Sequence, residues 1–180
     1  RWELEEGEVI EMPSPGEMHA LVCWFVIRVL TEYVLHRGSG HILTNDCGLI
    51  VRRKPDTVRG PDVMLSLDNL TLEEANPGHS QRIPTLVVEV FSPSDRPGRL
   101  YKRVEQYFRR GVPLVWVLYP EERTANVFRK GELPKVLDET ETLSGNGILP
   151  GFTCKVRDLF ELPGQAAKPA RPRPRKGSRD

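Results

Sequence analysis

The apolar run at residues 85–92 constrains the fold most, because a single acidic residue, Glu89, stands inside it. Valine and leucine at successive positions are typical of a strand that is buried on both faces and therefore lies centrally in a covered sheet. A carboxylate in such a strand is costly to bury unless a cation or hydrogen-bond donors compensate its charge. The run thus predicts a central strand that carries one charged side chain with a dedicated partner.

Two segments with the apolar spacing of helices lie on either side of this strand in the sequence. The longer one covers residues 14–38, and we expect Ser14 to cap it, Pro15 to occupy its first position and Gly38 to end it. The second helix is predicted over residues 96–111. Strand-like segments account for most of the other apolar positions, at residues 1–12, 41–53, 61–67, 113–120, 125–137 and 151–162.

This order of strands and helices predicts the fold class. We expect a mixed central β-sheet flanked by a helix on each side, which makes the domain α/β or α+β. Gly7 divides residues 1–12 into two short strands and so predicts an N-terminal hairpin. Residues 125–137 predict a second hairpin at the edge of the sheet, residues 151–162 close the fold, and we expect a C-terminal β-hairpin.

The chain divides into a predicted folded domain over residues 1–163 and a tail over residues 164–180. The tail is rich in proline and carries six basic residues against Asp180, a composition that is typical of disorder. Without the tail the chain has 20 basic and 24 acidic residues, of 26 and 25 in total, so the domain itself is weakly acidic. Two interpretations of the tail stay open: contact with nucleic-acid phosphates, or a solvated end.

The cysteines and the hydropathy pattern indicate where in the cell the protein is expected. Three cysteines at widely spaced positions, with no CxxC pair, are typical of reduced thiols in a cytoplasmic protein. The apolar stretch ALVCWFVIRVL is short and is interrupted by Arg28. We therefore expect no membrane-spanning segment and a cytoplasmic location.

Two acidic residues at the predicted strands form the first candidate site. Asp62 begins the strand at residues 61–67, and Glu89 lies in the central strand 27 residues later. Carboxylates on neighbouring strands can share a divalent cation such as Mg²⁺, and the carbonyl of Val90 could add a third oxygen ligand. The alternative is structural: Asp62 caps a turn, and Glu89 pairs with an arginine.

Three further residues are candidates near these acids. Lys102 lies early in the second predicted helix, where it could steady a phosphate or a water, although the apolar spacing of that helix places it on the solvent side. His19 lies early in the first predicted helix, and Glu8 follows the predicted turn; either could line a cleft. For His19 a position on the helix surface or in the core is the alternative.

Four stretches together resemble the Uma-two family of restriction endonuclease-like proteins, a branch of the PD-(D/E)XK nuclease superfamily. They read GEVIEMPSPGEMH, PDVML, VVEVFSPSDR and YKRVEQYFRRGVPLVWVLYP. The resemblance covers most of the chain before the tail. It implies a restriction-endonuclease-like core, a mixed sheet flanked by helices that carries a carboxylate metal site.

The same resemblance assigns roles to single residues. It gives metal binding to Asp62 and Glu89, and it places Glu8 and His19 in the same cleft. The usual lysine of the superfamily stands two residues after the acid, a position that Phe91 takes here. The resemblance then gives the supporting catalytic role to Lys102 on the following helix.

These observations favour an endonuclease that depends on Mg²⁺ or Mn²⁺ and hydrolyses phosphodiester bonds of DNA. The alternative is a catalytically inactive nuclease-fold module that binds nucleic acid or a partner protein. A homodimer formed through the stretch WFVIRVL or the C-terminal hairpin is a further hypothesis, because enzymes that cut both DNA strands often use two sites.

Overall fold

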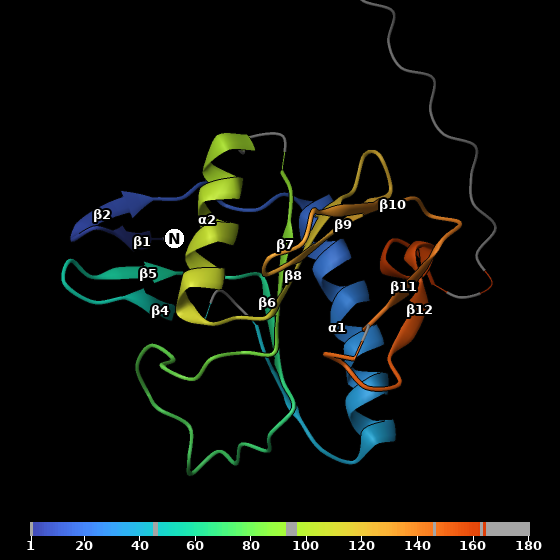
Figure 1. Ribbon diagram of the computed structural model, residues 1–180, viewed down its shortest axis with the longest axis horizontal. Helices are drawn as coiled ribbons and strands as arrows, with labels where there is room; N and C mark the ends of the chain where they lie inside the picture. The colour runs from blue at the N-terminus through green and yellow to red at the C-terminus, as the bar shows by residue number, and fades with distance from the viewer. Residues whose placement is uncertain (1, 45–46, 93–96, 146, 163, 165–180) are drawn as a thin grey trace, which may run out of the picture.

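A six-stranded mixed sheet forms the centre of the molecule, with α1 on one face and α2 on the other (Figure 1). The computed structural model describes residues 2–44, 47–92, 97–145, 147–162 and 164. The order of strands in this sheet is β10-β9-β8-β7-β6-β3. Its elements are β3 (His41–Leu43), β6 (Val63–Ser66), β7 (Leu86–Val90), β8 (Leu114–Tyr119), β9 (Thr124–Arg129) and β10 (Lys135–Leu137), with α1 (Glu17–Arg37) and α2 (Pro97–Arg110).

Strand β7 is the central strand that the sequence predicts. It runs parallel to β8 and antiparallel to β6, and all five of its residues are buried. Two parallel neighbouring strands need a crossover connection, and α2 supplies it between β7 and β8. This crossover brings α2 back over the strand that carries Glu89.

The two faces of β7 belong to two separate apolar cores. Val88 and Val90 pack in the core beneath α1, which also contains Trp116. Val87 packs in the core beneath α2, and Glu89 points toward the same helix because side chains alternate along a strand. The acid of the apolar run therefore faces α2.

A smaller antiparallel sheet lies beside α2 and forms the second wall of the region around Glu89 (Figure 1). Its strands are β2 (Glu8–Glu11), β1 (Trp2–Glu5), β5 (Thr57–Arg59) and β4 (Leu49–Arg52), in that order. Leu4 of β1 pairs with Val58 of β5, so the N-terminal hairpin joins a strand that comes about fifty residues later. This sheet places acidic and basic side chains against the helix.

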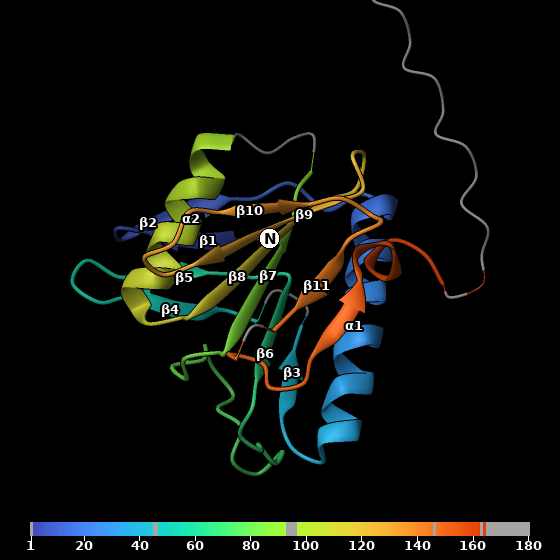
Figure 2. The same ribbon diagram turned by 45° about the vertical axis from the view of Figure 1, so that its right-hand side comes forward.

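The hairpin of β11 (Thr142–Ser144) and β12 (Thr153–Lys155) lies beside α1, followed by a 3₁₀ turn, η1 (Val156–Leu159) (Figure 2). The Arg28 guanidinium donates to the carbonyl of Asp158 at 3.0 Å, and the Tyr33 hydroxyl donates to the carbonyl of Pro150 at 3.1 Å. These bonds fasten the end of the fold to the outer side of α1.

Most fold predictions are confirmed. The mixed sheet has a helix on each face, Gly7 forms the N-terminal turn with a φ of 91°, and Gly38 ends α1 in the left-handed region with a φ of 75°. The β9–β10 hairpin lies at the sheet edge, and β11–β12 forms the C-terminal hairpin. The domain limit at residue 163 stays a prediction, since the predicted tail over 164–180 lies outside the described residues apart from Gly164.

The predicted start of the first helix is wrong. α1 begins at Glu17 with Gly16 as its N-cap and without a side-chain cap, so Ser14 and Pro15 precede the helix. Both residues instead contribute to the wall of a small cavity beside Asp62. The segment between β2 and α1 is therefore used to line the candidate site.

Within the described part of the chain, α1 is the one helix that is long and apolar enough to cross a membrane, judged by length and composition alone. A core helix passes the same test, and α1 buries Val22, Phe25, Val26, Val29 and Leu30 against the rest of the fold. The prediction that the sequence contains no stretch of sufficient length is thus not met, and 28% of the apolar window of α1 is buried inside the fold.

Candidate active site

The candidate site is a cavity of about 110 Å³ between the N-terminal hairpin and α2, at the end of β7. Apolar side chains form part of its wall, but charged residues dominate it. They come from β1, β2, β5, β7 and α2 and are Glu3, Glu5, Glu11, Arg59, Glu89, Arg99, Lys102 and Arg103. Shifted pKa values are expected where acidic and basic side chains are grouped around one cavity in this way.

Glu89 is the buried centre of this cluster, with 4% of its surface exposed. Its Oε1 accepts a hydrogen bond from the Tyr107 hydroxyl, and the Arg103 Nε lies 3.4 Å from the same oxygen. Burial raises the pKa of Glu89 to about 7, while Arg103 lowers it and Asp62 raises it further. The carboxyl group can therefore exchange a proton near neutral pH.

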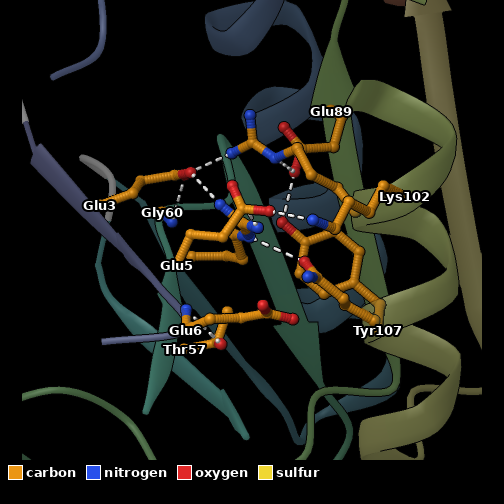
Figure 3. A network of polar contacts seen from close by, with 11 residues as sticks. Glu3, Glu5, Glu6, Thr57, Gly60, Glu89, Lys102 and Tyr107 are labelled. Atoms are coloured by element: carbon orange, nitrogen blue, oxygen red, sulfur yellow. Dashed lines mark hydrogen bonds and ion pairs between the residues drawn. The ribbon is translucent and has the colours of Figure 1, made fainter. Parts of the chain in front are cut away.

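Arg103 joins Glu89 to a second buried acid, Glu3 of β1 (Figure 3). The Glu3 carboxylate pairs with Arg103 and with Arg59, whose Nη1 lies 3.0 Å from Oε2, and it accepts a bond from the Gly60 amide at 2.9 Å. Burial alone would lower the pKa of Arg103, but Glu89, Tyr107 and Glu3 raise it well above its usual value. Arg103 thus stays charged between two acids.

Two more exposed charged residues, Glu5 and Lys102, lie next to these buried ion pairs. Glu5 lies between Arg59, with 3.2 Å from Nη2 to Oε2, and Lys102, whose ammonium group contacts Oε1 (Figure 3). The hydrogen bond from Lys102 contributes most to the lowered pKa of Glu5. The Arg59 Nε donates to Gln106 Oε1 at 2.8 Å, so Arg59 is held on three sides.

Asp62 lies immediately before β6 and is also buried. Its Oδ2 accepts a bond from the Val90 amide at 2.7 Å, and the His19 Nε2 lies 3.2 Å from the same oxygen. Because Val63 pairs with Val88, Asp62 and Glu89 come next to each other on paired strands. A small cavity is lined in part by His19, Asp62, Glu89, Val90 and Arg103.

Comparison with known proteins identifies the family. The model of the Uma2 family, described as "Putative restriction endonuclease", matches residues 1–157. The chain belongs to the Uma2 family. None of the curated proteins matches this sequence.

A solved structure has the same fold as this Uma2 protein. It is the crystal structure of a putative nuclease belonging to DUF820 from Anabaena variabilis, with a TM-score of 0.76. The two chains are 18% identical, and the match covers 88% of this chain and 89% of the other. At this identity the likeness shows the fold, and it confirms the predicted mixed sheet flanked by helices.

The structure of this Uma2 protein brings four of the predicted site residues together. Asp62, Glu89, Val90 and His19 line one cavity. Lys102 lines the neighbouring larger cavity with Glu89 and Val90, but its side chain is 51% exposed and pairs with Glu5.

Glu8 lies elsewhere. It occupies the first position of β2, next to the hairpin turn, and it is exposed. In the described residues it does not belong to the walls of these two cavities. Roles for the predicted site residues stay predictions.

Several charged or polar residues of the site are absent from the sequence predictions. Arg103 and Tyr107 stand four positions apart on α2, which places both on the side of the helix that faces Glu89. Glu3 and Glu5 stand two positions apart on β1 and so share the face that looks toward α2. The sequence feature that could have predicted Arg103 is Glu89 itself, because a buried carboxylate needs a positively charged partner on the helix that covers it.

The oxygen atoms at this site suit a divalent cation. Asp62, Glu89 and Val90 border the same cavity, and carboxylate and carbonyl oxygens are the ligands that Mg²⁺ and Mn²⁺ accept. Arg103 already provides a positive charge beside Glu89. The donor set fits such an ion, with Arg103 as a neighbouring counter-charge.

Proposed function

We propose that this Uma2 protein is a Mg²⁺- or Mn²⁺-dependent endonuclease that hydrolyses phosphodiester bonds of DNA. The observation that carries the proposal is the pair of buried acids, Asp62 and Glu89, which lie at the ends of adjacent strands and border one cavity with Arg103. Membership of a family described as "Putative restriction endonuclease" supports the reaction class.

Asp62, Glu89 and the Val90 carbonyl would hold the ion. A divalent cation at such a site lowers the pKa of bound water and neutralises charge on a phosphate. The Val90 amide and His19 fix the orientation of the Asp62 carboxylate, because both contact Oδ2. The Glu89 carboxyl group, with a pKa of about 7, can hold or release a proton under neutral conditions.

The cations of the cleft would position the DNA backbone. Arg99 and Lys102 are exposed residues of the first turns of α2 and line the larger cavity that Glu89 also borders. Lysine and arginine at such a rim bind phosphates in a salt-dependent way. We assign to Lys102 the binding of substrate phosphate and to Arg103 the support of Glu89.

Nicking of supercoiled plasmid with Mg²⁺ or Mn²⁺ tests the proposal. The wild type should nick, whereas Asp62→Asn and Glu89→Gln should each lose on the order of a hundredfold or more in rate, as expected when a group that stabilises the transition state is removed. Glu132→Gln, in the turn after β9, serves as the control and should nick like the wild type. Equal nicking by the wild type and Asp62→Asn would overturn the assignment.

A second candidate function is a catalytically inactive module that binds nucleic acid or a protein. Glu89 already has Arg103 and Tyr107 as partners, so its charge is compensated without an ion. Calorimetry separates the two functions. Binding of DNA in EDTA, together with no heat of Mg²⁺ binding at millimolar concentration, would favour the inactive module.

A homodimer and a cytoplasmic location belong to the same proposal. Met18, Leu21 and Trp24 of α1 are about half exposed, and Trp24 lies in the stretch WFVIRVL. Apolar side chains grouped on one helix are a plausible contact for a second copy, as such patches often mark interfaces. Sedimentation that finds only monomer at high concentration would remove the dimer.

A further inference from the structure

Cys23 is a further side chain with a metal-binding donor atom near Asp62. It stands four residues after His19 on α1, so both side chains lie on the same face of the helix. The Cys23 Sγ lies 3.6 Å from His19 Nδ1, and His19 Nε2 lies 3.2 Å from Asp62 Oδ2. One helix and the start of one strand thus place sulfur, nitrogen and oxygen together.

We propose that His19, Cys23 and Asp62 form a binding site for a thiophilic divalent cation such as Zn²⁺. One donor atom from each residue can be chosen so that all three lie within 4.8 Å of one another. Around Zn²⁺, with Zn–N of about 2.0–2.1 Å and Zn–S of about 2.3 Å, tetrahedral ligands lie about 3.3–3.8 Å apart. Rotation of the partly buried Cys23 and His19 side chains would bring the three donor atoms to these shorter distances.

The donor types select the metal. A thiolate and an imidazole favour Zn²⁺ and Co²⁺, whereas Mg²⁺ takes oxygen ligands. Three protein ligands with one open position are the arrangement of catalytic zinc sites, in which water occupies the fourth position.

The available space admits such an ion and a water. The cavity that borders His19 and Asp62 has a volume of about 30 Å³. A water needs about 10–15 Å³ of such volume, so the cavity has room for about two waters. A tetrahedral ion with three protein ligands needs space for a single water at its fourth position, which this cavity provides.

The site does not depend on nuclease activity, although it shares Asp62 with the proposed magnesium site. A carboxylate can serve two ions that lie about 3.5–4 Å apart. Occupation by Zn²⁺ would hold Asp62 toward α1. The competing explanation is a hydrogen-bonded chain of thiol, imidazole and carboxylate that binds no metal.

Titration of the purified, reduced protein with Co²⁺ distinguishes these explanations. A thiolate ligand gives an intense charge-transfer absorption in the near ultraviolet, and we expect it to saturate at one equivalent and to disappear when Zn²⁺ is added. Cys23→Ser should lose this absorption. Cys47→Ser and Cys154→Ser are matched controls, since both cysteines are free and partly buried, and each should keep it.

A second readout covers the case in which a Cys23 variant folds poorly. Zn²⁺ at a hundredfold excess over its dissociation constant should raise the melting temperature of the wild type, because it binds only the folded state. Cys23→Ala should show no such rise, and His19→Asn should bind at least tenfold more weakly. An absence of absorption in the wild type, or its persistence in Cys23→Ser, would overturn the site. Neither result bears on nicking with Mg²⁺, so the two proposals fail separately.

Discussion

The Arg103 guanidinium lies beside the Glu89 carboxylate inside the fold, with 3.4 Å between Nε and Oε1. The same guanidinium pairs with Glu3, so one cation serves two buried acids. Removal of one partner from a buried ion pair leaves an uncompensated charge, which costs far more than the loss of a surface pair.

Arg103→Met is therefore expected to destabilise the protein by about 3–5 kcal/mol, as for other buried ion pairs that lose one partner. Urea denaturation measures the change. Arg109→Met is the control on the same helix, because Arg109 is exposed and pairs only with Glu105 four residues earlier among the described contacts. Its effect should stay within about 0.5 kcal/mol. An equal effect of both substitutions would contradict the role of Arg103.

Glu89 should make stability depend on pH. Its pKa is raised from 4.5 to about 7 in the folded protein. Between these values the folded protein keeps a proton that the unfolded chain has released, so the free energy of unfolding falls as the pH rises through this window. Above the folded-state pKa both states are ionised, and this dependence ends.

Glu89→Gln removes the titrating group and gives the comparison. The free energy of unfolding of the wild type, minus that of Glu89→Gln, should decrease from about pH 5 to about pH 8, the range that brackets the shifted pKa. Urea denaturation at several pH values provides this difference. A difference that stays constant or grows with pH would contradict the raised pKa.

Lys102→Gln should separate substrate binding from the later steps. Lys102 is half exposed and pairs with Glu5, so the substitution should change stability by less than about 1 kcal/mol. If Lys102 contacts phosphate equally in the bound substrate and in the transition state, KM for an oligonucleotide should rise about tenfold with kcat unchanged. A lowered kcat at unchanged KM would instead give Lys102 a role in the chemical step.

The packing of α1 can be tested through two leucines on one helix. Leu30 is fully buried, whereas Leu35 is 75% exposed. Leu30→Ala should cost about 2–5 kcal/mol of unfolding free energy. Leu35→Ala should change it by no more than about 0.5 kcal/mol. Similar small effects of both substitutions would show that α1 does not pack as the core helix described above.

Much of the fold was predictable because its apolar patterns are strong. The run around Glu89 is apolar at nearly every position, and burial on both faces of β7 follows from covering the sheet with two helices. The start of α1 was not predictable in the same way. Ser14 and Pro15 match a helix start locally, but the chain uses them to close the cavity beside Asp62, a tertiary role that overrides the local preference.

The site was predictable in part for a similar reason. Glu89 was visible as an acid in an apolar run, and Asp62 as an acid at the start of the neighbouring strand. The partner of Glu89 on α2, Arg103, was harder to predict. Consecutive helical residues differ by about 100° in direction, so Lys102 and Arg103 contact different residues. Tyr107 has the spacing of an apolar core residue, and nothing in the sequence shows that its hydroxyl reaches Glu89.

The ion pair between Glu3 and Arg103 joins residues that are 100 positions apart in the sequence. Contacts of such long separation form only after the entropy of closing a large loop has been overcome. During synthesis, the Glu3 carboxylate therefore gains its partners late, because Arg59, Gly60 and finally Arg103 follow it in the sequence. The cavity between the N-terminal hairpin and α2 should accordingly be among the last parts of the molecule to form, after the helices of a newly made chain.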